Sequence, residues 1–116
     1  VDGAVIVSTP QDVAFLDAKK AIGMFSTVKV PVVGIIENMS SFICPGCGKE
    51  TQIFGHGGVR EAAVRMRLPF LGEVPIDLAI REGGDSGSPL VAAHPDSPQT
   101  KVFREMAESL QRQLGL

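Results

Sequence analysis

Two short apolar runs, separated by one amphipathic segment, most strongly limit the folds open to this chain. Residues 3–9 (GAVIVST) and 32–37 (VVGIIE) are rich in β-branched side chains and lack polar alternation. Such runs are typical of strands buried on both faces of a parallel sheet. Between them, apolar residues recur at helical spacing from Val13 to Phe25, with charged side chains on the opposite side. Strand, helix and strand in this order predict a β-α-β unit.

The rest of the chain continues this alternation and predicts an α/β fold with a parallel sheet, in one domain over residues 1–116. In such sheets, ligands bind beyond the carboxyl ends of the strands. The residues that follow the carboxyl ends of the predicted strands are polar or include proline. Such residues suit either a ligand-binding edge or ordinary helix caps and turns. The further segments are a glycine-rich loop at 38–58, a helix at 59–67, a strand at 68–74, a helical turn or two at 77–82, a loop at 83–98 and a last helix at 100–114.

Charge and hydropathy exclude several function classes. The net charge of −2 gives no general attraction to nucleic acid or to anionic membranes. The sequence has no apolar run near the roughly 18 residues of a membrane-spanning helix. Two cysteines are too few for a secreted disulfide scaffold, which favours a reducing compartment. The chain starts at Val1, directly before a predicted strand, and we expect it to be a fragment of a longer protein.

Both cysteines lie in the segment ICPGCGKE, as Cys44 and Cys47. A redox pair of the thioredoxin type would open a helix, whereas Gly48 and an extended stretch at 52–54 follow here. A second interpretation is a pair of unligated thiols in a loop. The third is metal binding, because C-P-x-C followed by glycine resembles one knuckle of a zinc ribbon.

The number of thiols makes the metal interpretation specific. Tetrahedral zinc takes four ligands, and a four-iron cluster usually takes four cysteines, but this chain supplies two. His56 is a candidate third ligand, although a lone histidine in a glycine-rich loop is more often a plain surface residue. The remaining ligands would then come from a second copy of the chain, related by a twofold axis. Thiolates are ligands of both zinc and iron–sulfur clusters, so the residue types do not distinguish between the two.

Three longer segments carry a resemblance to a known family. They are GAVIVSTPQDVAFLDAKKAIGMF, VPVVGIIENMSSFICPGCGKETQIFGHGG and PFLGEVPIDLAIREGGDSGSPLV. Together they closely resemble the C-terminal half of the Mrp/ApbC family, which are MinD-like P-loop ATPases that carry iron–sulfur clusters. ENMS, then CPxC, then IFG-x-x-G is a far more specific combination than an isolated C-x-x-C.

The resemblance implies a fold, a site and partners. The fold would be the C-terminal portion of a three-layer, parallel-sheet P-loop NTPase. Cys44 and Cys47 would bind a labile 4Fe-4S cluster shared between the two subunits of a homodimer, for transfer to apo iron–sulfur proteins. Asn38 matches a strand-end asparagine that hydrogen-bonds adenine. Pro75, Ile76 and Asp77 match the segment that closes over the base and ribose.

The sequence departs from the family pattern in one respect. It contains no G-x-x-x-x-G-K-[ST] motif, so the phosphate loop and its lysine are missing. ATP with Mg²⁺ and ATP hydrolysis are therefore expected of the longer protein, and the fragment alone should be inactive. The alternative function is a structural zinc-knuckle dimerisation module without cluster transfer. A MinD-like partitioning ATPase without metal is a weaker third possibility. The resemblance fits the cytoplasm or, alternatively, the mitochondrial matrix.

Overall fold

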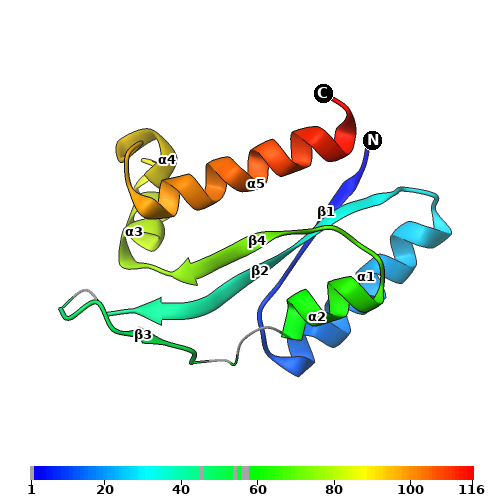
Figure 1. Cartoon of the computed structure of the whole chain (residues 1–116), viewed down its shortest axis with the longest axis horizontal. Helices are drawn as coiled ribbons and strands as arrows, with labels where there is room; N and C mark the ends of the chain where they lie inside the picture. Colours follow the sequence, from blue (N-terminus) through cyan, green and yellow to red (C-terminus); the bar gives the residue numbers. More distant parts are fainter. Residues whose placement is uncertain (1, 45, 54, 56–57) are drawn as a thin grey trace.

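The computed structural model describes residues 2–44, 46–53, 55 and 58–116, with only the backbone described at residues 12–14. Strands and helices follow one another as the apolar patterning predicts, and three helices come after the last strand. Figure 1 shows them as a twisted sheet with helices on both faces. The elements are β1 (Ala4–Ser8), α1 (Asp12–Thr27), β2 (Val32–Ile43), β3 (Glu50–Thr51), α2 (Gly58–Arg65), β4 (Phe70–Ile76), α3 (Leu78–Ser86), α4 (Leu90–Ala93) and α5 (Pro98–Leu114).

Strand β2 lies at the centre of the sheet. It pairs in parallel with β1 on one side and with β4 on the other. Near its end it also pairs with the short antiparallel strand β3. The parallel sheet predicted from the apolar runs is thus confirmed, with one antiparallel addition.

The core is divided between the two faces of the sheet. On one face, Ile6 and Ile35 pack with Val59 and Ala63 of α2 and with α1. On the other face, Leu71 and Val74 pack with Met106 of α5. Figure 1 shows this arrangement, with α5 across one face and α1 and α2 across the other. Coverage of both faces explains why the parallel strands are apolar without alternation.

The ends of α5 show how local chemistry sets its bounds. The Ser97 hydroxyl accepts a hydrogen bond from the backbone N–H of Thr100 at 3.1 Å, and Pro98 occupies the first turn. This cap begins the helix two residues before the predicted start, because proline suits a first turn, where its missing N–H costs nothing. At the other end, Gly115 has a φ of 73° and closes the helix in the left-handed conformation.

The predicted loop at 38–58 is wrong in its first part. Strand β2 continues through these polar residues to Ile43. Phe42 pairs with Ile76 of β4 on one side and with Thr51 of β3 on the other. The buried hydroxyl of Ser40 also donates a hydrogen bond to the Val74 carbonyl at 3.3 Å. Pairing on both sides satisfies the backbone, and this outweighs the local polar sequence.

The predicted loop at 83–98 is also wrong in part. Helix α3 runs on to Ser86, and residues 90–93 form the short helix α4. A side chain at Gly83 would lie 2.7 Å from the Ser88 carbonyl oxygen, so glycine permits the chain to fold back closely here. Gly87, with a φ of 75°, ends α3. Among the described residues, no helix is both long enough and apolar enough to cross a bilayer.

Candidate functional site

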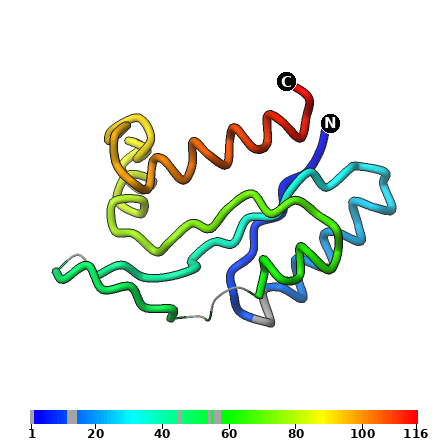
Figure 2. Tube along the Cα trace, in the orientation of Figure 1, coloured from blue at the N-terminus to red at the C-terminus, as the bar shows by residue number. Residues whose placement is uncertain are grey.

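The cysteine pair lies at the turn between β2 and β3. The backbone N–H of Cys44 donates to the Lys49 carbonyl at 2.9 Å, and the N–H of Gly48 donates to the Cys44 carbonyl at 2.8 Å. Gly48 has a φ of 73°, which glycine adopts without strain. Figures 1 and 2 show this hairpin reaching beyond the helices at one end of the molecule.

The environment of Cys44 favours its thiolate form. The backbone N–H groups of Gly46 and Cys47, followed by the Cys47 thiol, hydrogen-bond to the Cys44 sulfur and lower the pKa of Cys44 below its ordinary value. Both thiols are unbridged, with Cys44 partly exposed and Cys47 exposed. A thiolate that accepts backbone N–H groups is a suitable ligand for a soft metal.

The hairpin supplies a partial metal site. Within the part of the chain that the structure describes, no cluster of three or more histidine, cysteine, aspartate or glutamate side chains could hold a metal ion. His56, the candidate third ligand, lies outside the described residues. Among the residues that the structure describes, the ligands at this hairpin are the two thiols, and the second copy that would complete the site stays a prediction.

A second group of predicted site residues comes together where the middle of β2 lies beside the end of β4. Asn38 is in register with Val74, the residue before Pro75. The next pair, after an irregularity in the register, joins Phe42 to Ile76. Asn38 and the segment 75–77 thus lie on adjacent strands, although the strand end predicted at Asn38 lies instead at Ile43. The nearby polar residues Ser8 and Glu37 are buried in the same row of the sheet.

Asn38 lines a mainly apolar groove of about 540 Å³ between the sheet and α5. Val7 and Ile80 also line it. The Asn38 side-chain oxygen accepts a hydrogen bond from the backbone N–H of Met39 at 3.0 Å. Met39 has a φ of 55°, which is unusual for a residue with a side chain. The Asn38 side-chain oxygen thus supports the strained backbone at Met39. The side-chain NH2 group of Asn38 has two further hydrogen-bond donors.

The Asp77 carboxylate is engaged within the fold. One oxygen accepts from the backbone N–H groups of Ala79 at 2.8 Å and Ile80 at 3.4 Å, which caps α3. The other oxygen accepts from Gln99 Nε2 of α5 at 2.8 Å. The sequence reasoning missed Gln99, because no local pattern links positions 22 residues apart.

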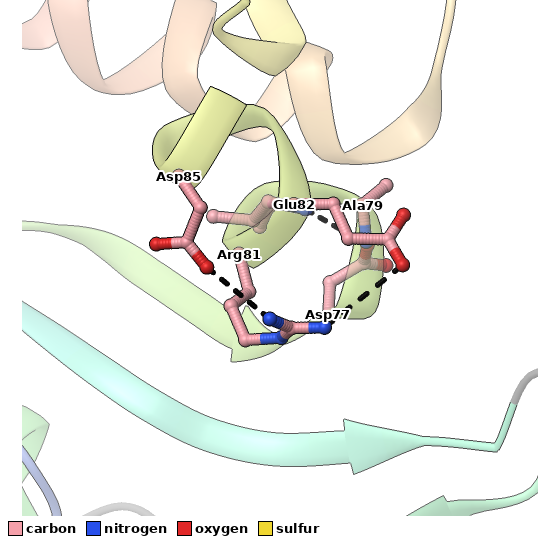
Figure 3. A network of polar contacts seen from close by, with 6 residues as sticks. Asp77, Ala79, Arg81, Glu82 and Asp85 are labelled. Atoms are coloured by element: carbon pink, nitrogen blue, oxygen red, sulfur yellow. Dashed lines mark hydrogen bonds and ion pairs between the residues drawn. The ribbon is translucent and has the colours of Figure 1, made fainter. Parts of the chain in front are cut away.

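Charged side chains surround this cap. In Figure 3, Arg81 lies between Glu82 and Asp85, next to the start of α3. Arg81 pairs with Asp85 at 3.2 Å and with Glu82 at 3.9 Å. All three side chains are exposed, so these ion pairs contribute little to stability.

Known structures define the class of protein to which this fold belongs. MinD from Pyrococcus horikoshii, solved with Mg-ADP, superposes with a TM-score of 0.72 at 24% identity, covering 98% of this chain and 43% of that one. A likeness at this identity supports the fold alone. The fold is that of a MinD-like P-loop ATPase, and the predicted fold class is confirmed.

A solved structure with higher identity is a nucleotide-binding protein from Archaeoglobus fulgidus in complex with ADP. It shares 38% identity and a TM-score of 0.69 over 88% of this chain and 41% of that chain. The chain belongs to the NUBPL iron-transfer P-loop NTPase family, which it matches over residues 1–111. The resemblance to cluster-carrying P-loop ATPases predicted from the sequence is thereby confirmed.

Two curated relatives agree with this assignment. The iron-sulfur cluster transfer protein NUBPL of Dictyostelium discoideum is 50% identical over 98% of this chain and 35% of its own length. The iron-sulfur cluster carrier protein of Salmonella typhimurium is 47% identical over 98% of this chain and 31% of its own length. The chain thus spans about a third of the length of these relatives.

Proposed function

We propose that the protein containing this chain is an ATP-dependent iron–sulfur cluster carrier. Two copies would hold one 4Fe-4S cluster between them, each giving Cys44 and Cys47. The observation that carries the proposal is the hairpin turn, which presents two thiols near the surface and directs backbone N–H groups at the Cys44 sulfur. The cluster is the cargo, and the thiolates are its temporary ligands.

The family assignment favours this function over the structural zinc knuckle. Iron transfer is the description of the family that the chain matches. The position of the hairpin suits transfer as well. Its tip lies at one end of the molecule, where the thiolates of an apo iron–sulfur protein could approach and replace Cys44 and Cys47 (Figure 2).

Nucleotide binding completes the proposal. Asn38 of β2 and the backbone of Pro75, Ile76 and Asp77, on and just after the adjacent strand β4, would form the base side of an ATP site. Both Asp77 carboxylate oxygens already accept hydrogen bonds within the fold. Asp77 would therefore contribute by holding the start of α3 in position. The phosphate loop and Mg²⁺ would come with other segments of the longer protein. The 116-residue chain alone should therefore not hydrolyse ATP.

Anaerobic reconstitution with Fe²⁺ and sulfide tests the role of the cysteines. We expect about two irons and two sulfides per chain, because two copies share a four-iron cluster, together with visible absorption. The double variant Cys44→Ala, Cys47→Ala should lose all three signals. Lys49→Ala changes the same hairpin but keeps both thiols, so it should load normally. Equal iron, sulfide and absorption in the double variant would overturn the proposed function.

We also propose that the protein works in a reducing compartment. The bacterial cytoplasm is the first candidate and the mitochondrial matrix is the alternative. Both thiols are unbridged in the structure, as ligand transfer requires. Fractionation of the source cells with an antibody against the chain distinguishes the two compartments, and recovery in a secreted fraction would contradict both.

A further inference from the structure

Strand β2 contains an irregular stretch between the proposed nucleotide-binding residue Asn38 and the cysteine hairpin. Asn38 and Phe42 are four positions apart, whereas their partners in β4, Val74 and Ile76, are two positions apart. Strand β2 therefore accommodates two extra residues here, and we call residues 39–41 the β2 bulge. Bulges bend a strand and redirect the side chains that follow.

The β2 bulge lies where regular strand pairing is interrupted on both sides. On the β4 side, the residue opposite is Pro75, which has no N–H to donate to a ladder. On the other side, pairing with β1 ends at Glu37, and pairing with β3 begins at Phe42. Contacts other than these two ladders must therefore set the conformation of the bulge.

Two side chains supply such contacts. The Asn38 side-chain oxygen accepts from the Met39 N–H at 3.0 Å, and this local bond supports the Met39 φ of 55°. The Ser40 hydroxyl donates to the carbonyl of Val74, in the neighbouring strand, at 3.3 Å. Ser40 is 3% exposed, so this bond is shielded from water. Of the two bonds, the one from Ser40 joins the bulge to β4.

We infer that Ser40 is a positioning residue for the cysteine hairpin. The inference rests on the proposed function, in which Cys44 and Cys47 bind the cluster. Only Phe42 and Ile43 separate the β2 bulge from Cys44. The direction in which β2 leaves the bulge therefore determines where the Cys44 sulfur lies. A bulge joined to β4 by Ser40 keeps that direction constant while a cluster is bound.

A purely structural role is the alternative, since a buried hydroxyl needs a hydrogen-bond partner in any fold. The two roles predict different results when the hydroxyl is lost. A structural role lowers the stability of the whole chain. A positioning role loosens the strand after the bulge, together with any cluster bound there, and leaves the strand before the bulge unchanged.

Cluster release from the longer protein tests the inference. Wild type, Ser40→Ala, Ser40→Thr and Ser41→Ala are reconstituted anaerobically with Fe²⁺ and sulfide, and the decay of visible absorption is followed after addition of EDTA. We expect Ser40→Ala to release its cluster roughly threefold to tenfold faster, the factor that corresponds to one hydrogen bond. Ser40→Thr keeps the hydroxyl and should release at nearly the wild-type rate. Ser41→Ala is the matched control, because Ser41 is 5% exposed in the same strand, and it should release as wild type does.

Hydrogen exchange of the apo protein gives a readout that needs no cluster. The Cys44 N–H donates to the Lys49 carbonyl after the bulge, and the Ile35 N–H donates to the Pro69 carbonyl before it, both at 2.9 Å. In Ser40→Ala, the Cys44 N–H should exchange faster than in wild type, whereas the Ile35 N–H should exchange at the same rate. Unchanged exchange at Cys44, or equal acceleration at both positions, would overturn the inference.

The same samples distinguish failure of the inference from failure of the proposed function. If wild type loads no cluster, the proposed function fails, and the inference fails with it. If wild type loads a cluster and Ser40→Ala releases it at the wild-type rate, only the inference fails. Release from Ser40→Thr or Ser41→Ala as fast as from Ser40→Ala would also overturn the inference, because the Ser40 hydroxyl would then have no specific effect.

Discussion

Gln99 Nε2 donates a hydrogen bond to Asp77 Oδ2 at 2.8 Å, which joins the first turn of α5 to the cap of α3. The other Asp77 oxygen caps α3 through the N–H groups of Ala79 and Ile80. One carboxylate thus fixes the start of α3 relative to α5. The segment before it, Pro75–Ile76, ends β4 beside Asn38 and the cysteine hairpin.

Removal of this carboxylate should destabilise the fold. Asp77→Ala should lose about 0.5–2 kcal/mol for the cap and about 0.5–1.5 kcal/mol for the bond to Gln99. Gln99→Ala should lose only the second amount. Asp77→Asn keeps a capping oxygen, and Gln99 can turn its amide oxygen toward the new NH2 group, so this variant should stay close to wild type. Urea denaturation measures the free energies of unfolding, and an Asp77→Ala loss no greater than that of Gln99→Ala would contradict the capping role.

Asn38 should contribute to nucleotide affinity in the longer protein. Asn38→Asp keeps the oxygen that accepts from Met39 N–H but loses the amide donors. We expect ATP binding to weaken by about tenfold, because one hydrogen bond contributes on the order of 1 kcal/mol, with little change in thermal stability. Isothermal titration calorimetry with ATP measures the affinity, and Asn38→Ala would lower both affinity and stability. Unchanged ATP affinity in Asn38→Asp would count against the base-side assignment.

The Gly46 N–H should control the reactivity of Cys44, because its hydrogen bond is the largest cause of the lowered Cys44 pKa. Gly46→Pro removes this N–H, whereas Gly46→Ala keeps it and brings its new carbon no closer than 3.8 Å to the Cys44 sulfur. A lowered pKa means that the thiolate is already present at lower pH. Alkylation by iodoacetamide should therefore reach half its maximal rate at a higher pH in Gly46→Pro than in Gly46→Ala.

The experiment is made in a Cys47→Ser background, so that a single thiol reacts. The backbone N–H at position 47 remains in that background. Identical pH profiles for the two Gly46 variants would show that the Gly46 N–H does not stabilise the thiolate.

Two glycines should respond to alanine in opposite directions. A side chain at Gly34, near the start of β2, would overlap the Leu71 side chain, which is buried. Gly34→Ala should therefore cost about 1–3 kcal/mol through overpacking. A side chain at Gly84, inside α3, would meet no atom within 4 Å. Gly84→Ala should stabilise the chain by about 0.5–1 kcal/mol, the difference in helix propensity. Urea denaturation measures the free energy of unfolding of both variants. A Gly34→Ala variant with the same free energy of unfolding as wild type would refute the packing described for β2.

The parallel strands and the main helices could be predicted because their signals are local. Residues 32–37 form a buried apolar run, and the stripe at 100–114 has helical spacing. The sequence also predicted that the cysteine pair lies outside a helix, because Gly48 and the residues after it disfavour a helix. Each of these features depends on neighbours in the sequence.

The extension of β2 to Ile43 had no such local signal. Phe42 is held by Ile76 and Thr51, which come later in the chain. The continuation of α3 through Gly83 likewise depends on the close approach of Ser88. The Gln99–Asp77 bond joins two elements that only the tertiary fold brings together. Contacts between distant residues thus determined the end of β2 and the Gln99–Asp77 bond, whereas a contact between residues five apart determined the end of α3.

The length of β2 gives it a mechanical role. Asn38 and Ile43 belong to one continuous strand, and Cys44 follows directly. Asn38 and Phe42 are four residues apart in β2, but their partners Val74 and Ile76 are two apart in β4, so the chain advances about 13 Å from Asn38 to Cys44. A rotation of about five degrees at Asn38 would thus displace Cys44 by about 1 Å, several times the roughly 0.2 Å tolerance of a metal–ligand distance. A small rotation of β2 at Asn38 would therefore be enough to change the distance between the Cys44 sulfur and a bound metal.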